Sequence, residues 1–298
     1  MISVLAGIAV GIALALPLAS AYALFGLGIV VIHRASRVLN LAHGAIATLP
    51  AYLLYSLSPR IGIPAAVLLS LFAGGLLGVA VERLVVRRLR RVSQTAQTVG
   101  TVAVFALLVA VMGKVWGTNL LPGVSLVPHQ AFRVGQALMF TEDLALIAAS
   151  ILGSLVFFGL FKFTHFGLAM RLAADNRQAA SLMGIDPDRT TAQAWFLAGV
   201  FAALGGVLLA GESGLHPYLL PLQMLPAFVA ALLGGLDSAF GVVLGALVVG
   251  VAIGIVPSLG SIGQQPGMPQ VALTALALVV MARRGVRLQA GDVRSSLA

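Results

Sequence analysis

The chain has 298 residues, of which 60% are hydrophobic and only 9% are charged, against roughly 25% charged in an average soluble domain. Its mean hydropathy is +1.05. So few charged side chains cannot cover the surface of a soluble domain, which excludes a soluble enzyme, a disordered chain and a secreted scaffold. The sequence contains no Cys, so disulfides and thiolate sites are excluded as well. The composition indicates an integral membrane protein.

Apolar segments of spanning length follow one another along the chain, since a spanning helix needs about 20 apolar residues. They lack the alternating polarity of barrel strands. We therefore predict an all-α, polytopic bundle of about eight to ten transmembrane helices, some interrupted, that forms one domain over 1–298. The predicted segments are 1–32, 38–59, 61–81, 92–113, 144–161, 190–211, 217–236, 241–257 and 269–283.

Two of these segments need comment. Residues 1–32 carry no charge and favour a first helix, with a break near Pro17. A cleaved signal peptide is the alternative, but it lacks a positive charge before Arg34. The charge-free run 238–282 has 45 residues, about 68 Å as a straight helix, so it must turn back. The break is assigned to Pro257, Gly260, Gly263, Pro266, Gly267 and Pro269.

The basic residues indicate the orientation. With nine spans, 15 of the 18 Lys and Arg fall on one side, and Arg60, Lys114 and Arg133 on the other. The positive-inside rule makes the richer side cytoplasmic, with the C-terminus inside and the N-terminus outside. The net charge of +9 therefore reflects the membrane orientation of the chain rather than nucleic-acid binding. We expect the lipid bilayer to surround the helices.

The segment 162–190, between two predicted spans on the cytoplasmic side, is the most informative. Residues 168–183 favour a helix, which Gly167 can open and Gly184 can end as a C′ glycine. Asp186 and Pro187 begin the next turn. A solvated loop and a helix on the membrane surface are the simpler interpretations. The small apolar residues among few charges favour docking into a groove on a partner protein.

This segment resembles the coupling loop of LivH-type permeases, the subunits of branched-chain amino acid ABC importers. The resemblance implies that the helix sits in a groove of a cytoplasmic ATPase subunit. The family's Glu-Ala-Ala core is Gln178, Ala179 and Ala180 here, so a carboxylate is replaced by an amide. The residues expected to couple to the ATPase are Gly167, Arg171, Asp175, Gln178, Ala179, Ala180, Met183, Gly184 and Ile185.

A second stretch, around Asn40, His43 and Gly44, resembles the family's Asn-Phe-Ala-His-Gly segment. Polar groups that enter an apolar helix must face the bundle interior or a partner. We prefer a structural role, with Asn40 as an N-cap and His43 as a hydrogen-bonded packing residue, over a place in the translocation path. The five His lack the spacing of metal ligands, so no metal site is expected.

A third stretch contains Gly234, Gly235 and Asp237, where the family carries Gly-Gly-Leu-Gly-Ser, so Asp237 replaces a glycine. We predict a tight turn between two short helices that needs a positive φ at Gly234 or Gly235. Such interrupted segments point to the pore region of transporters. The glycine pairs Gly74/Gly78, Gly241/Gly245 and Gly250/Gly254 allow close helix contact.

The sequence shows no phosphate-binding loop and no hydrolase motif, so catalytic residues and cofactors are not expected in this chain. The resemblance implies an importer subunit that works by alternating access. Its implied partners are ATP-binding ABC ATPase subunits, a second, related permease and an extracytoplasmic substrate-binding protein. Branched-chain or related small amino acids are the implied substrates. Urea or short amides within the same family, an ion-coupled secondary transporter and an intramembrane enzyme remain alternatives.

Overall fold

Apolar helices make up most of the structure, a computed structural model that describes residues 2–135, 137–258, 261, 263–265 and 267–295. A two-stranded hairpin is the only sheet in these ranges. The elements in chain order are α1 (Ile2–Ser36), α2 (His43–Ile61), α3 (Ile63–Val81), the π-helix η1 (Glu82–Val86), α4 (Arg87–Leu89), α5 (Gln94–Trp116), β1 (Ala131–Val134), β2 (Ala137–Phe140), α6 (Thr141–Phe163), α7 (His165–Asp175), α8 (Arg177–Leu182), α9 (Pro187–Ser213), α10 (Leu219–Gly234), α11 (Ala239–Ile255), the 3₁₀ turn η2 (Val256–Ser258) and α12 (Met268–Ser295).

The chain is an all-α, multi-pass membrane protein. Each of the nine predicted apolar segments coincides with one helix of the described part. Five helical stretches are long and apolar enough to cross a membrane, and three shorter apolar helices follow them. The number of spans therefore stays a prediction. The five long stretches are Val10–Ser36, Ile63–Leu89, Gln94–Trp116, Thr141–Phe163 and Pro187–Ser213.

Helices α1 and α9 form the centre of the bundle. Helix α1 packs against α6, α9, α10 and α11, and α9 also packs against α2 and α3. In the most apolar window of α1, 83% of the residues are buried, against 22% in α5. The outer helices therefore leave apolar faces to lipid or to other chains.

Glycines set the closest helix contacts. A Cβ on Gly245 of α11 would lie 2.2 Å from the Ala230 carbonyl oxygen of α10, and one on Gly250 would lie 2.5 Å from Cβ of Ala19 in α1. A Cβ on Gly74 would lie 2.8 Å from the Gly199 carbonyl oxygen. The predicted close contact of glycine-bearing helix faces is confirmed at these crossings.

The structure corrects two local expectations and adds a hairpin that the sequence did not predict. Helix α1 continues through Pro17 without a break, because the helices packed around it hold it in place. The third segment extends beyond residue 81 into η1 and α4. The segment 114–143 contains the antiparallel pair β1–β2, in which Ala131 lies opposite Phe140. The turn between α11 and α12 is present, and its Gly260 and Pro266 lie outside the described residues.

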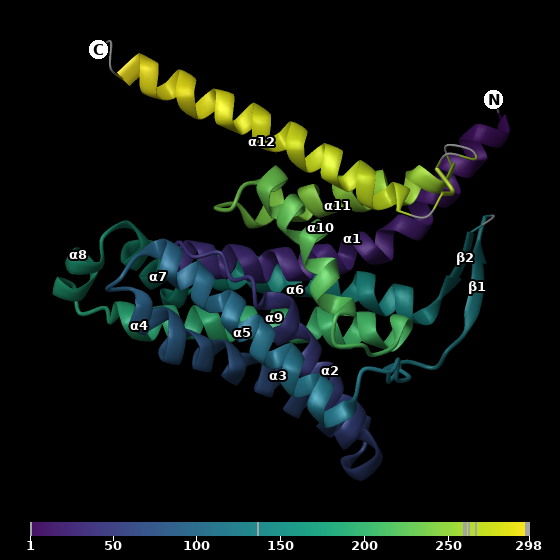
Figure 1. The fold of residues 1–298 in the computed structure, drawn as a ribbon, viewed down its shortest axis with the longest axis horizontal. Helices are drawn as coiled ribbons and strands as arrows, with labels where there is room; N and C mark the ends of the chain where they lie inside the picture. The colour runs from purple at the N-terminus through teal and green to yellow at the C-terminus, as the bar shows by residue number, and fades with distance from the viewer. Residues whose placement is uncertain (1, 136, 259–260, 262, 266, 296–298) are drawn as a thin grey trace.

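The two ends of the bundle differ. Figure 1 shows the β1–β2 hairpin at one end, and α7, α8 and α4 at the opposite end. Helix α1 contacts α7; Arg34 lies in the last turn of α1, and Arg37 directly follows the helix. We call this end the basic end, because Arg87, Arg90 and Arg177 lie there as well.

Candidate functional site

The segment 162–190 folds into two short helices at the basic end, α7 and α8, rather than the predicted single helix over 168–183. Asn176 breaks the helix: its backbone is extended, and its side chain accepts a hydrogen bond from the Ala179 amide at 3.0 Å as the N-cap of α8. Helix α7 begins at His165, two residues before Gly167, and Thr164 caps it. The expectation that Gly167 opens the helix is wrong.

Gly167 has a packing role instead. A Cβ at this position would lie 2.3 Å from the Phe161 carbonyl oxygen, so only glycine lets α7 turn this closely against the end of α6. Arg171 donates from Nε to the Gly167 carbonyl oxygen at 3.3 Å. The angle between α6 and α7 therefore depends on this glycine.

The end of α8 follows the predicted pattern. Gly184 has φ 81° and is the C′ glycine. The Ile185 amide donates to the Ala180 carbonyl oxygen at 3.0 Å, and the Gly184 amide donates to that of Ser181 at 3.1 Å, which is a Schellman motif. Asp186 then caps α9 by accepting hydrogen bonds from the amides of Asp188 and Arg189. Both turns fix where α8 sits relative to α9.

Helix α8 presents an uncovered apolar surface. Leu182 is 91% exposed and Met183 is 69% exposed. Ala180 is fully buried and anchors the helix from the other side. Of the remaining predicted coupling residues, Ile185 is half-buried, and those that are exposed are Arg171, Asp175, Gln178, Ala179 and Gly184. Exposed side chains of this size and polarity suit a protein–protein contact.

A charge network connects α8 with two long helices; it consists of Glu82, Arg87, Arg90, Arg177 and Asp188. Arg87 donates to both carboxylate oxygens of Glu82, at 3.1 and 2.9 Å, and Glu82 is 0% exposed. Arg90 lies 3.4 Å from Glu82 and 2.7 Å from Asp188. Arg177 of α8 lies 2.5 Å from the same oxygen of Asp188. The network thus joins the end of α3, the start of α9 and α8.

Arg177 completes this network while partly withdrawn from solvent. Burial lowers the pKa of the Arg177 guanidinium below its ordinary value; the Arg90 charge lowers it further, and Asp188 opposes both effects. Its second contact is Thr191, at 3.4 Å. In the sequence, Arg87 and Arg90 indicate only which side of the membrane is cytoplasmic. The sequence signal for this ion pair is Glu82, an acidic residue at the end of an apolar helix and five residues before Arg87.

The stretch around Asn40 lies just before α2. Asn40 is not the N-cap of α2, which is Ala42; its side chain accepts from the Ala42 amide at 3.1 Å. His43 is fully buried, and its ring faces the backbone of Phe25, so the structure places it as a packing residue. Gly28 gives the ring its space, since a Cβ there would lie 2.5 Å from Nε2 of His43.

Gly44 lets α2 approach α10. A Cβ on Gly44 would lie 2.6 Å from Cγ of Met224 and 2.7 Å from Cα of Pro221. The neighbouring Leu41 amide donates to the Thr101 hydroxyl at 3.0 Å, which ties this stretch to α5. The observed geometry of Asn40, His43 and Gly44 is that of a helix junction.

The third stretch forms the turn between α10 and α11. Gly235 has the predicted positive φ, 94°. A Cβ on Gly234 would lie 2.0 Å from the Gly241 carbonyl carbon, so the two helices meet at glycine. Asp237 is not buried; its side chain is 61% exposed and lies 3.1 Å from Arg37. Arg37 has φ 56°, and Gln94 donates to its carbonyl oxygen.

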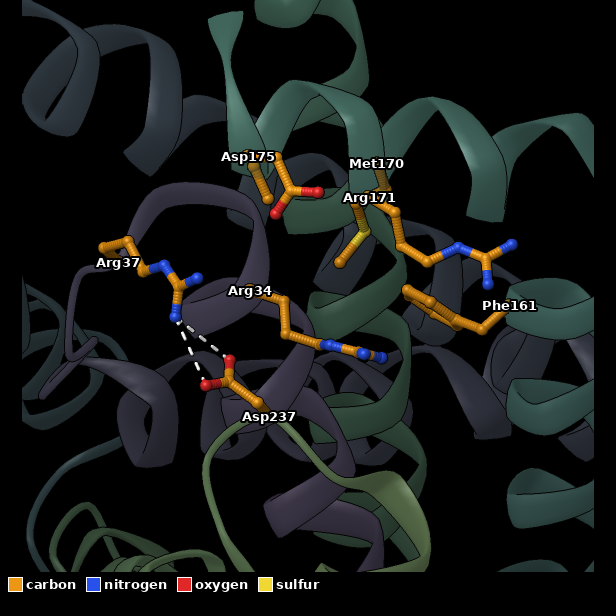
Figure 2. A pocket seen from close by; sticks show the side chains of 8 residues that line it. Arg34, Arg37, Phe161, Met170, Arg171, Asp175 and Asp237 are labelled. Carbon is orange, nitrogen blue, oxygen red and sulfur yellow. Dashed lines mark hydrogen bonds and ion pairs between the residues drawn. The ribbon is translucent and has the colours of Figure 1, made fainter.

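The three stretches meet around the end of α1. Arg37 and Asp237 line one pocket of about 290 Å³ together with Arg34, Arg171 and Asp175. Figure 2 shows the Arg37–Asp237 pair on one side of this pocket and the side chains from α7 on the other. Segments far apart in the sequence therefore share one pocket at the basic end.

Comparison with known proteins identifies the family. The sequence profile described as "Branched-chain amino acid transport system / permease component" matches residues 11–282. The chain belongs to this family. Membership in this permease family makes it a transport subunit rather than an enzyme. Among the described residues, no three His, Asp or Glu side chains gather in a way that could hold a metal ion.

Curated relatives in this permease family are LivH-type proteins. A high-affinity branched-chain amino acid transport system permease protein, LivH of Salmonella typhimurium, is 28% identical over 251 residues, 79% of this chain and 81% of that protein. LivH of Escherichia coli K12 is 27% identical over the same length. BraD of Pseudomonas aeruginosa is 28% identical over 258 residues, 80% of this chain and 82% of that protein.

A looser similarity links the chain to a solved structure. A chain of PsaBC from Streptococcus pneumoniae, in complex with Fab, has a TM-score of 0.49 and 15% sequence identity. The match covers 90% of this chain and 89% of that chain.

Proposed function

We propose that the chain is the membrane-spanning permease subunit of an ATP-driven ABC importer for branched-chain or related small amino acids. It acts in the bacterial inner membrane with its basic end and C-terminus in the cytoplasm. A binding protein delivers the substrate outside, and a second, related permease completes the path. Relatives named as branched-chain amino acid permeases over about four-fifths of the chain support this substrate class.

The observation that carries the proposal is the exposed face of α8 beside the charge network. Leu182 and Met183 are exposed, whereas the opposite side of α8 is fixed by Ala180 and Arg177. An ATPase subunit that binds this face can move α8, and the charge network passes the displacement to α3 and α9. ATP is bound by the ATPase subunits, and alternating access follows from the helix movement.

Reconstitution tests the proposal. The chain is combined in proteoliposomes with the ATPase subunits, the second permease and the binding protein of the proposed importer. We expect uptake of radiolabelled leucine only with ATP inside and binding protein outside, and competition by valine or isoleucine but not by urea. Uptake by the chain alone under an ion gradient would overturn the ABC assignment, and competition by urea would overturn the substrate class.

A pair of variants tests the docking face. Met183→Glu places a charge on the exposed surface of α8, so we expect the ATPase subunits no longer to co-purify. Leu138→Glu is the matched control, since Leu138 is 49% exposed on the β1–β2 hairpin at the opposite end of the bundle. Unchanged co-purification with Met183→Glu would contradict the proposed contact.

A further inference from the structure

The pocket at the basic end is lined by more arginine than aspartate side chains. Figure 2 shows that Arg34 and Arg171 both extend away from the Arg37–Asp237 pair, with Phe161 between their guanidiniums. Arg37 is paired with Asp237, but Arg34 and Arg171 have no ion-pair partner among the described residues. Arg34 lies 5.9 Å from the centre of the Phe161 ring. Two guanidiniums beside an apolar ring thus face one cavity.

Asp175 also lines this pocket, so the lining residues include one carboxylate that is not engaged by Arg37. One carboxylate cannot neutralise two guanidiniums. A phosphate group can bind both, because each guanidinium fork donates two parallel hydrogen bonds to an oxyanion. The unpaired charge therefore favours an anion with several oxygens.

An apolar groove continues the pocket along the same three elements. It has a volume of about 430 Å³ and is lined by Leu27, Ser150, Ile151, Ser154, Leu155, Phe158, Ala239, Phe240 and Val243. On α1, Leu27 lies two turns before Arg34, and on α6, Phe158 lies one turn before Phe161. On the third side, Ala239 follows Asp237 by two residues. The groove therefore runs from the pocket toward the middle of the membrane-spanning helices.

The groove is open to the bilayer rather than closed by the chain. Its lining side chains Ile151, Leu155, Phe158 and Phe240 are 58%, 64%, 50% and 72% exposed. The stretch from Ser150 to Phe161 rises about 16 Å along α6, a length that matches much of one leaflet of a bilayer core about 30 Å thick. The groove thus has the length and polarity of a site for an acyl chain.

We propose that pocket and groove together form a binding site for an anionic phospholipid. The phosphate contacts the guanidiniums of Arg34 and Arg171 beside the Phe161 ring, and one acyl chain lies in the groove between α1, α6 and α11. A soluble anion would satisfy the guanidiniums but leave the groove empty, whereas a neutral lipid would fill the groove without adding net charge to the pocket. Basic pockets between transmembrane helices bind anionic headgroups in this manner. The bound lipid would connect α7 with the ends of α1 and α6.

The test uses the assembled transporter in detergent, measured by native mass spectrometry. Phosphatidylglycerol, phosphatidylethanolamine or inorganic phosphate is added to the parent complex. We expect phosphatidylglycerol to be retained about tenfold more tightly than phosphatidylethanolamine, and inorganic phosphate not to displace it. Equal retention of the two lipids would overturn the proposal. Displacement of phosphatidylglycerol by inorganic phosphate would also overturn it and would indicate a site for a free anion. If the complex retains neither lipid, a second protein chain covers this face and the lipid site is wrong.

Two variants locate the lipid. The double substitution Arg34→Gln and Arg171→Gln should abolish the preference for phosphatidylglycerol, and Ser154→Trp, which fills the groove, should lower retention of both lipids. Arg88→Gln is the matched control, since Arg88 is an exposed arginine of α4 at the same end that does not line the pocket. An unchanged preference in the double variant would overturn the site. If that variant does not assemble, the comparison of lipids on the parent complex still decides.

Discussion

Arg90 and Asp188 lie 2.7 Å apart although 98 positions separate them in the sequence. Arg90 follows α4 at the end of the α3–η1–α4 stretch, and Asp188 is in the first turn of α9. Arg177 of α8 contacts the same carboxylate oxygen. The Asp188 carboxylate therefore links α8 both to α9 and to the α3–η1–α4 stretch. Packing of α8 against α9 alone would not connect α8 to that stretch.

The buried end of this network should matter most for stability. In Arg87→Gln, the fully buried Glu82 loses the fork that binds both its oxygens and keeps only the longer contact to Arg90 at 3.4 Å, a loss of about 3 kcal/mol. Glu82→Gln should cost less, because Arg87 is 33% exposed and can be solvated. Thermal unfolding of the purified complex measures both, with Arg88→Gln as the control. A smaller shift for Arg87→Gln than for Glu82→Gln would contradict this account.

The exposed end of the network should affect coupling rather than folding. In Arg177→Gln, the link from α8 to Asp188 is lost, but the ion pair was partly exposed and contributes at most about 1 kcal/mol. We expect unfolding temperature to stay near that of the parent and ATP hydrolysis to continue. Leucine uptake per ATP hydrolysed should fall severalfold. Uptake and phosphate release are measured in the same proteoliposomes.

Arg189→Gln is the comparison for that variant, since Arg189 is 84% exposed and pairs only with Asp186, within its own turn. Its ratio of uptake to hydrolysis should equal the parent ratio. If Arg177→Gln leaves the ratio unchanged as well, the charge network does not transmit movement from α8.

The turn after α8 depends on one backbone conformation. Gly184→Ala places a Cβ at φ 81°, which costs roughly 1–2 kcal/mol and weakens the Schellman motif. We expect faster hydrogen exchange at the amides of Gly184 and Ile185 and a loss of uptake. Gly184→Asn, which tolerates this conformation better, should lie between Ala and the parent. Gly159→Ala, where a Cβ meets open space, should change neither; equal exchange in all variants would contradict the prediction.

The sequence predicted most of the helical architecture for identifiable reasons. Long charge-free runs predict apolar helices, and Gly184 and Gly235 occupy turns where a positive φ is needed. Asp186 and Pro187 predicted a turn, and α9 begins there, at Pro187. Each of these signals acts within a few residues, so it can be recognised without knowledge of the fold.

Other features depend on contacts that the sequence does not show. Asn176 splits α7 from α8 although its neighbours favour a helix, because an extended N-cap competes locally with helix continuation. Glu82 and Asp188 become one site only after α3 and α9 pack together. Asp237 lies within an apolar run of the sequence, and the turn at Gly235 brings it to the surface beside Arg37. Long-range packing decides the positions of Glu82, Asp188 and Asp237, whereas the break at Asn176 is a local effect.

Close backbone contact explains the need for glycine where α10 meets α11. In Gly245→Ala, the new Cβ would lie 2.2 Å from the Ala230 carbonyl oxygen, so the helices must separate, at a cost of about 1–3 kcal/mol. Gly113→Ala in α5 meets nothing closer than 3.7 Å and should be neutral or slightly stabilising. Thermal unfolding of both variants checks this, and equal unfolding temperatures would contradict it.

The Arg37–Asp237 ion pair should make only a small, salt-dependent contribution to leucine uptake. Both side chains are more than half exposed, so the pair contributes at most about 1 kcal/mol. It is also screened at physiological ionic strength, where the Debye length is about 8 Å. Asp237→Gly, which introduces the residue found in the resembled motif, should therefore keep leucine uptake within about twofold of the parent. Uptake by the parent should depend more on salt than uptake by the variant. A large loss of uptake in Asp237→Gly that high salt does not reproduce in the parent would assign Asp237 a role beyond this ion pair.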